Sequence, residues 1–410
     1  MKDQFVFTTA LRTKLLTAML VGVVMFIAGA FISNNIHRVW AALLHNTMFF
    51  TLVALASVFF ITVHTLAFGG WYTVLKRIPE AVSKVVPLGM SILIAFMGLM
   101  YLDSKEYIHI GISHLYHWME KGITDPASPN YDAIIAWKKG FLNWGTFIVL
   151  TLVFSFGWIF LAGKFREASL QEDKEGGLSN YKLTRKWSAY FAVVFAVSSS
   201  VFSWLWLMSI NPHWYSTLFG WYSFVSYWVT GITVITLICI FLKENGYLTF
   251  MNENHFHDLA KYMFGFSVFW TYLWFSQYML IWYANIPEET VYFKHIRENY
   301  RFWFWANFLI NFLVPFLALM KRDFKRNLNR LKVVGMIIVF GHWLDYYLMI
   351  TPWGLKHTGG GSPCNMWLME LGGALFFIAL YLSITFKYLS SVPLYTKNNP
   401  FIKESLGHQI

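Results

Sequence analysis

Long apolar stretches, separated by shorter polar segments, recur along the whole chain. Each stretch is near 20 residues long, which is the length of an α-helix that crosses the hydrocarbon core of a bilayer. Membrane-spanning strands would instead alternate apolar and polar residues over about ten positions, and these stretches do not alternate. The pattern predicts an all-α polytopic membrane protein, with residues 1–410 forming a single membrane domain. We expect about ten transmembrane helices, near residues 15–33, 46–75, 85–102, 141–163, 187–209, 218–242, 260–284, 302–320, 332–351 and 366–390.

Two segments depart from this simple pattern. The stretch 46–75 is too long for one upright helix, and it contains Gly69 and Gly70, a pair typical of a bend or of a close contact between helices. The longest loop, residues 103–140, carries the amphipathic sequence "YIHIGISHLYHWMEK". We expect this sequence to form a helix that lies flat on the membrane surface.

Lysine and arginine residues are distributed unevenly between alternate loops. If the N-terminus is cytoplasmic, more than two thirds of the 32 basic residues fall in the inside segments. Because short cytoplasmic loops are enriched in Lys and Arg, this distribution predicts that both termini are cytoplasmic.

The composition agrees with an integral membrane protein. Of the 410 residues, 57% are hydrophobic and 13% are charged, whereas soluble chains have about 25% charged residues. In this setting the net charge of +11 indicates contact with anionic lipid headgroups, and we expect no nucleic acid partner. The two cysteines, Cys239 in an apolar run and Cys364 in a loop, exclude a cysteine-ligated cluster and do not favour a disulfide. No nucleotide-binding loop or nucleophile elbow is present.

The most unusual apolar stretch is "VVGMIIVFGHWLDYYLMITPWG", because ionisable residues in lipid are costly and therefore candidates for function. His342 and Asp345 are three positions apart and share one face of a helix. Counted from Lys332, Asp345 lies roughly 20 Å along the helix, in the outer half of the membrane, with His342 near the middle. Tyr346 and Tyr347 add hydroxyl groups. The pair fits a proton relay, and it equally fits a hydrogen-bonded pair that holds helices together.

A second histidine, His64, precedes Lys76 by twelve residues, which places it roughly 18 Å from the cytoplasmic end and near the middle of the membrane. His64 fits a partner for the face that carries His342 and Asp345, and it also fits a haem ligand. For a bis-histidine haem, His64 and His342 are the only suitable pair. A buried histidine with satisfied hydrogen bonds is the alternative.

Charged residues also stand at two predicted membrane edges. Glu288 and Glu289 follow a span whose last turns include Gln277, and they fit either the outer mouth of a proton path or a solvated loop. Arg77 and Glu80 are spaced for a local ion pair, and the same pair would suit the cytoplasmic opening of a path.

Four further histidines lie in predicted outer loops. Of His109, His114 and His117, only the last two share a helical face, and no third ligand is evident. We therefore expect a surface helix and no metal site there. In the loop "SINPHWYSTLFGWY", His213 and Trp214 are expected to anchor the chain at the headgroups.

Five segments carry a resemblance to a known family. They are "FGGWYTVLKRIPEA", "SINPHWYSTLFGWY", "FSQYMLIWYANIPEET", "FLVPFLALMKRDFKR" and "GHWLDYYLMITP". In this order they resemble the F-type membrane subunits of bacterial alternative complex III, a quinol:cytochrome c oxidoreductase. Those subunits belong to the polysulfide-reductase (NrfD/PsrC-like) membrane-subunit family. The resemblance extends from about residue 40 to residue 352.

The resemblance implies two four-helix bundles, helices 2–5 and 6–9, flanked by helices 1 and 10. It implies a chain of the bacterial inner membrane that binds no redox cofactor itself. The expected partners are a paralogous quinol-binding membrane subunit, an iron–sulfur subunit, multihaem and monohaem cytochrome c subunits and a terminal oxidase. The resemblance also implies proton-conducting half-channels. The residues of this chain that would form such a path are His64, His342, Asp345 and Tyr346, with Glu288 at its outer exit.

Two other functions remain open at this point. A quinol-binding subunit of the same superfamily would need a polar pocket near the outer surface, which Asp103, His342 and Asp345 are able to line. A secondary transporter would have helices interrupted at corresponding positions of two halves. The interruptions found here, at Gly69–Gly70, Pro315 and Gly372–Gly373, do not correspond.

Overall fold

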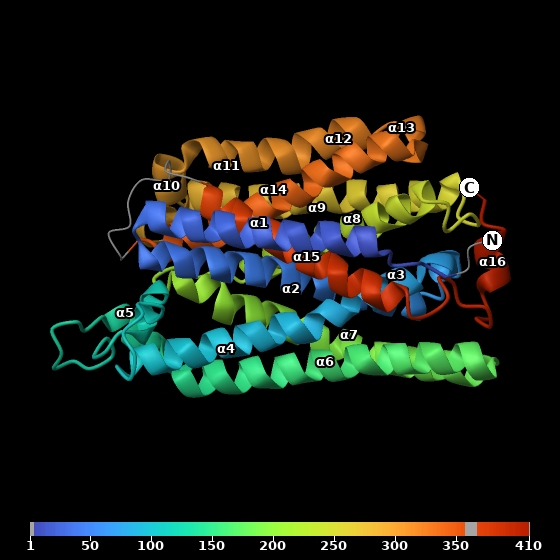
Figure 1. The fold of residues 1–410 in the computed structure, drawn as a ribbon. Coiled ribbons are helices and arrows are strands. Elements are labelled where there is room, and N and C mark those ends of the chain that lie inside the picture. The colour runs from blue at the N-terminus through green and yellow to red at the C-terminus, as the bar shows by residue number, and fades with distance from the viewer. Residues whose placement is uncertain (1–3, 357–366, 410) are drawn as a thin grey trace.

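The computed structural model describes residues 4–356 and 367–409, and these residues are almost entirely helical (Figure 1). The described part of the chain contains no strand, only an isolated bridge between Gln4 and Pro393. Nine of its helices are long and apolar enough to cross a membrane. The prediction of an all-α multi-pass membrane protein is therefore confirmed. The nine spans are α1 (Thr9–Ser33), α2 (Ile36–Leu66), α3–α4 (Arg77–Ser104), α6 (Trp144–Glu175), α7 with a following turn (Leu178–Ile210), α8 (Leu218–Glu244), α11–α12 (Arg301–Leu319), α14 (Leu328–Gly354) and α15 (Leu368–Leu389).

The predicted span 260–284 lies within α9 (Glu253–Ala284), which is not one of these nine helices. Its Trp, Tyr and Gln residues lower its mean hydropathy, although the helix is as long as α6. α9 packs against α8 and α12. Shorter elements connect the long helices: η1 (Trp71–Leu75), α5 (Ala133–Trp137), α10 (Pro287–Asn299), the π-helical turn η7 (Leu309–Leu313) between α11 and α12, and α13 (Arg322–Arg326). A short helix, α16 (Ile402–Leu406), follows α15.

Several helix boundaries differ from the predicted ones. α2 starts ten residues earlier than predicted, at Ile36, and ends at Leu66. The backbone then turns through Phe68, which has a positive φ, and Gly69–Gly70 lead into η1. The predicted bend is therefore present, and it is sharp enough to end the helix. The predicted start of the last helix, residue 366, and Cys364 lie outside the described residues, whereas Cys239 is buried.

The basic segment between the predicted spans 141–163 and 187–209 is mostly helical. α6 continues to Glu175 and α7 begins at Leu178. The chain reverses at Gly176 and Gly177, whose φ angles of 67° and 78° lie in the left-handed region that glycine adopts without strain.

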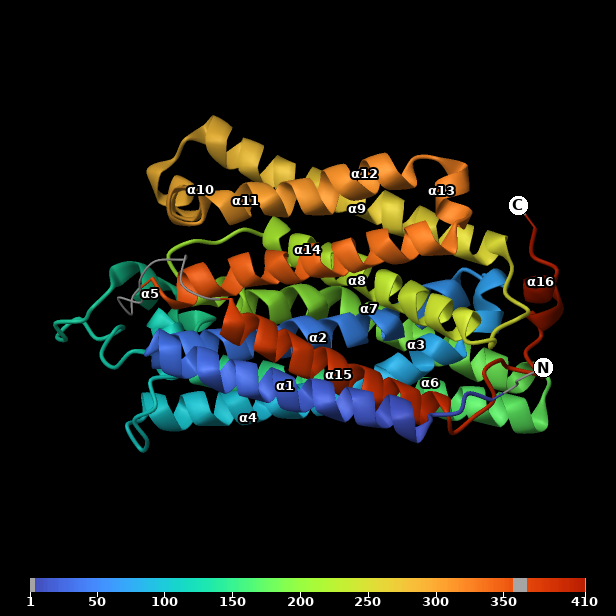
Figure 2. The same cartoon turned by 45° about the horizontal axis from the view of Figure 1, so that its top comes forward.

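The long helices pack in two groups with a pair beside them (Figures 1 and 2). α2, α4, α6 and α7 contact one another, as do α8, α9, α11–α12 and α14. α2 also packs against α8 and α14, so it joins the two groups. α1 packs along α15, where a Cβ added to Gly22 would lie 2.7 Å from the carbonyl oxygen of Gly372. The two helices therefore touch through their backbones.

The long helices run side by side and together are called the helix layer here, and its two ends differ (Figure 1). Both ends of the described chain lie at one end of the layer, near α16, and α5 with its loops lies at the other (Figure 1). α2 and α8 are central, since 83% of the most apolar window of each is buried, against 17% for α1. Apolar side chains of α1, such as Leu20, Val24 and Phe31, are exposed, as expected for a lipid-facing helix.

Candidate functional site

Asp345 accepts four hydrogen bonds in the interior of the second helix group. Its Oδ1 accepts from the Tyr222 hydroxyl and from Asn307 Nδ2 at 2.8 Å. Its Oδ2 accepts from Ser226 Oγ at 2.8 Å and from Trp270 Nε1 at 3.0 Å. All five side chains are buried. The donors come from α8, α9 and α11, so one carboxylate on α14 joins four helices.

His342 joins this cluster through Ser226. The distance from His342 Nδ1 to Ser226 Oγ is 3.1 Å. Because the serine hydroxyl has one hydrogen and donates it to Asp345, the hydrogen between Ser226 and His342 comes from Nδ1. Nε2 is then the unprotonated nitrogen, and it has no hydrogen-bond partner among the described residues. The predicted pair therefore shares a site, and a serine connects its members.

The sequence places these groups through helical spacing. Tyr222 and Ser226 are four residues apart on α8, and Asn307 and Asn311 are four residues apart on α11 and η7. Asn311 Nδ2 donates to Asn307 Oδ1 at 2.6 Å, which orients the amide that binds Asp345. Uncharged polar residues spaced four apart in an apolar span lie on one face of the helix. This spacing indicates a polar site, but it is missed when only ionisable residues are considered.

A close contact between α14 and η7 keeps the asparagines in place. A Cβ on Gly341 would lie 2.3 Å from Asn311 Oδ1 and 2.5 Å from Ile310 Cγ2. Only glycine fits at position 341 without a shift of the neighbouring turn. The turn itself is π-helical, a form that is frequent at functional sites.

A small cavity adjoins Asp345. Its volume is about 20 Å³, and its polar lining comes from Tyr222, Gln277, Tyr292, Asn307 and Asp345. A water needs about 10–15 Å³ and two to four polar partners, so the cavity has room for one. Gln277 Nε2 has no partner in the described part of the chain and is a donor for such a water. Tyr292 belongs to α10, which lies at the same end of the layer as α5 (Figure 1).

Tyr346 is fully buried, but its hydroxyl and its ring contact residues outside the Asp345 cluster. Its hydroxyl donates to the Ser223 carbonyl at 3.3 Å, and its ring packs on Phe49 at 5.6 Å. No hydrogen bond joins Tyr346 to Asp345 among the described residues. The tyrosine that binds the carboxylate is Tyr222 of α8, because adjacent residues on a helix point in different directions.

The spacing to Lys76 predicted that His64 lies near the middle of the membrane, but that spacing does not measure depth. α2 ends two residues after His64, so that distance cannot be counted along one helix. His45 of α2 contacts the Trp343 carbonyl at 2.9 Å, and His64 lies about 28 Å farther along α2 at 1.5 Å per residue. His64 and His342 therefore lie at different depths, and a shared haem would require matched depth.

The surroundings of His64 are aromatic. Its Nδ1 contacts the Phe60 carbonyl at 2.8 Å, and its ring packs against Trp71, Tyr72 and Tyr262. Nε2 has no partner within the described ranges. His64 is thus a buried histidine at the end of α2, separate from the Asp345 cluster.

Glu288 is also separate from that cluster. It lies exposed in the first turn of α10. The residues of α10 that line the cavity are Tyr292, Phe293 and Ile296, one turn or more farther along. The structure therefore does not bring Glu288 together with Asp345.

A buried ion network lies at the end of the layer near the chain termini. Lys76 Nζ is 3.0 Å from Glu172 Oε2, and both side chains are almost completely buried. Asn399 Nδ2 donates to the other oxygen of Glu172 at 3.0 Å. Burial lowers the pKa of Lys76, but the carboxylate of Glu172 outweighs it, so the pKa is raised and the ammonium stays charged.

Arg77 is the second cation of this ion network. It is 2.6 Å from Glu80, as its spacing predicted, and it also pairs with Asp173 of α6. Arg77 Nη1 donates to Ser169 Oγ at 3.0 Å. The local pair is therefore part of a network that attaches η1 and α3 to α6.

A second polar contact between α2 and α14 is not evident from the sequence pattern. Trp343 Nε1 donates to Asn46 Oδ1 at 3.0 Å. Nearby, Arg38 Nε is 2.9 Å from Glu370, a buried ion pair between α2 and α15. The predicted span began at residue 46, so Arg38 and His45 appeared to lie in a loop.

The predicted surface helix in the loop 103–140 is wrong. Asp103 accepts backbone bonds from Ile110 at 2.8 Å, Gly111 at 3.2 Å and Ser113 at 2.9 Å, and Gly111 has φ 70°. These bonds hold the segment in turns. Asp103 is therefore a loop anchor, and it does not share a pocket with Asp345.

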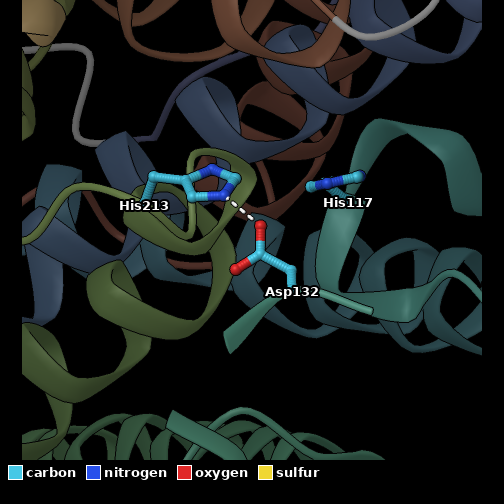
Figure 3. A group of neighbouring side chains, drawn as sticks. All are labelled: His117, Asp132 and His213. Atoms are coloured by element: carbon cyan, nitrogen blue, oxygen red, sulfur yellow. Dashed lines mark hydrogen bonds and ion pairs between the residues drawn. The ribbon is translucent and has the colours of Figure 1, made fainter. Parts of the chain in front are cut away.

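The histidines of the outer loops do not form a single cluster. His109 is exposed, and the ring of His114 packs on His37 at 5.5 Å. His117 instead lies beside His213 and Asp132 (Figure 3). Trp214, expected at the headgroups, is buried and stacks on Tyr292 at 4.0 Å. The expectation of headgroup contact for Trp214 is thus wrong.

No protein-family model matches the chain, and no curated protein matches it. The fold, the polar sites and the resemblance of the five segments are the observations that bear on function.

Proposed function

We propose that this chain is a membrane subunit of a bacterial respiratory quinol:electron-acceptor oxidoreductase of the alternative complex III type. The five sequence segments described above support the proposal. The packing of the helices supports it as well, because two groups of four with a flanking pair are what the resemblance implies. Under this proposal the membrane is the bacterial inner membrane and both termini are cytoplasmic.

The proposed role of the chain has two parts. It scaffolds the complex through its lipid-facing and partner-facing helices, and it handles protons in the outer half of the membrane. One observation carries the second part: His342, Ser226 and Asp345 form a continuous hydrogen-bonded row that ends at a water-sized cavity. Hydroxyl, imidazole and carboxyl groups in such a row can each accept and donate a proton.

The redox chemistry belongs to the partners in this proposal. The chain binds no redox cofactor, and electrons pass from a paralogous quinol-binding subunit to iron–sulfur and c-type haem subunits. The cavity at Asp345 does not favour a quinol site at that carboxylate, since ligand pockets measure about 300–1,000 Å³ and this one measures about 20 Å³. A quinol headgroup would not fit there.

The transporter alternative finds less support in the helices. Gly372 and Gly373 lie inside the continuous helix α15, and Pro315 lies within the helical run α11–α12. Only Gly69–Gly70 coincides with the end of a helix. Corresponding interruptions in two halves would be expected of a transporter.

Purification of the chain from its native membrane in a mild detergent tests the subunit assignment. The proposal predicts that iron–sulfur and multihaem cytochrome c subunits co-purify and that the preparation oxidises a quinol. A monodisperse chain without partners, obtained under conditions that keep other respiratory complexes intact, would contradict it.

A further inference from the structure

Three segments of the chain bring potential metal ligands together at the end of the layer opposite the termini. His117 lies in a short turn after α4, Asp132 immediately precedes α5, and His213 lies between α7 and α8. One ligand atom from each residue lies within 4.8 Å of the other two (Figure 3). None of the three takes part in the proposed proton row.

The chemistry of this group suits one class of metal ion. Two imidazole nitrogens and one carboxylate oxygen are a ligand set that favours Zn²⁺ over Mg²⁺ or Ca²⁺, which prefer oxygen. His213 Nε2 is 2.7 Å from Asp132 Oδ2. A metal ion would replace the proton that these two atoms share, and the two atoms would move apart to make room for it.

Asp132 is already oriented for this role. Its Oδ1 caps α5 by accepting from the backbone amides of Ile134 at 2.9 Å and Ile135 at 3.1 Å. The cap fixes the carboxylate and turns Oδ2 towards His213. A ligand held by a second interaction loses little conformational freedom when it binds a metal.

His117 has a similar support. Its Nδ1 is 3.0 Å from Glu120 Oε1. In metal sites, a carboxylate bonded to one nitrogen of a histidine orients the ring, and the other nitrogen binds the metal. The three ligand side chains are 17–31% exposed, so an ion can reach them from solvent and a water can complete the coordination.

We propose that His117, Asp132 and His213 form a zinc-binding site that fastens the loop before α5 to the segment between α7 and α8. With three protein ligands from three segments, the ion would act as a clasp at this end of the layer. The proposal is independent of the respiratory assignment.

Zinc titration of the full chain in detergent tests the site. The chain is prepared without a polyhistidine tag, treated with EDTA and dialysed, and zinc is measured by elemental analysis and by competition with a chromophoric chelator. We expect one Zn²⁺ per chain and a rise in the unfolding temperature on zinc addition. Millimolar Mg²⁺ or Ca²⁺ should not displace the zinc. A chain that takes up no zinc would overturn the proposal.

Substitutions locate the bound ion. Asp132→Asn retains a good N-cap residue while it removes the anionic ligand, and it should weaken zinc binding at least tenfold. His213→Ala should do the same, and Glu120→Gln should weaken binding about 10–100-fold. His109→Ala, an exposed histidine of the same loop, is the matched control and should bind like the wild type. Equal zinc affinity in the Asp132→Asn, His213→Ala and control chains would overturn the assignment.

Discussion

The hydroxyl of Ser226 on α8 donates to Oδ2 of Asp345 on α14 at 2.8 Å. The sequence leaves two roles open for Asp345, a bond between helices and a proton relay, and this hydrogen bond takes part in both. It is one of four bonds that join helices around the carboxylate, and it is the only one that continues to His342. The four bonds together predict a stabilising role, and the connection through Ser226 predicts a proton route. The two roles make separate predictions.

Asp345→Asn should destabilise the protein because an amide cannot accept from all four donors. Whichever way the new amide points, its NH₂ group faces the N–H of Asn307 or of Trp270. The Trp270 bond is broken if the NH₂ group faces Trp270, and it is weakened if it does not, because the remaining amide oxygen is uncharged. In both orientations Trp270→Phe should cost less in the Asp345→Asn background than in the wild type. We expect a coupling free energy of about 1 kcal/mol in a double-mutant cycle of thermal unfolding.

A tryptophan of the other helix group provides the control for this cycle. Trp158 Nε1 donates to Ser198 Oγ at 2.9 Å, on α6 and α7. Trp158→Phe should be additive with Asp345→Asn. If both tryptophan substitutions were additive, the conclusion that Asp345 is held as an acceptor by Trp270 would be wrong.

Gly341→Ala should disturb the same site from the other side. The added Cβ would overlap Asn311 and Ile310, so the π-helical turn must shift. Overpacking of this kind costs about 1–3 kcal/mol, measured as a lower unfolding temperature. Gly265→Ala on α9, where a Cβ has nothing within 4 Å, should leave the unfolding temperature unchanged or raise it. Equal effects of the two substitutions would refute the close contact.

Lys76→Met tests the buried ion network near the termini. It leaves the Glu172 carboxylate buried without its cation, and we expect a loss of about 3–5 kcal/mol in the free energy of unfolding. The double substitution Lys76→Met, Glu172→Gln should recover most of this loss. Lys121→Met, which breaks an exposed pair with Glu106, should cost no more than about 1 kcal/mol. A double variant as unstable as Lys76→Met would argue against the ion pair as the cause.

The sequence predicts where the membrane spans lie, but it does not predict where their helices end. Hydropathy locates the spans because backbone groups in lipid must bond within a helix. It does not locate their ends, since helices such as α6 continue beyond the apolar region to Glu175. The depth of His64 cannot be counted from Lys76 for this reason: α2 ends at Leu66, and the distance to Lys76 crosses a turn.

The candidate site follows from the sequence only in part. His342 and Asp345 are visible because charged groups are rare in spans. Their partners Ser226, Trp270 and Asn307 are common residue types in apolar helices, and only tertiary packing shows that they face one carboxylate. The association of Asp132 with His213 depends in the same way on how two distant loops meet.

Proton release per electron, measured in proteoliposomes that contain the purified complex, tests the central claim most directly. His342→Ala, Asp345→Asn and Ser226→Ala each interrupt the row, whereas Thr236→Val on α8 removes a hydroxyl that bonds only to its own helix. The account predicts fewer protons per electron in the first three variants, with measurable quinol oxidation, and an unchanged ratio in Thr236→Val. An unchanged ratio in all four variants would contradict the proton route and leave Asp345 as a bond between helices.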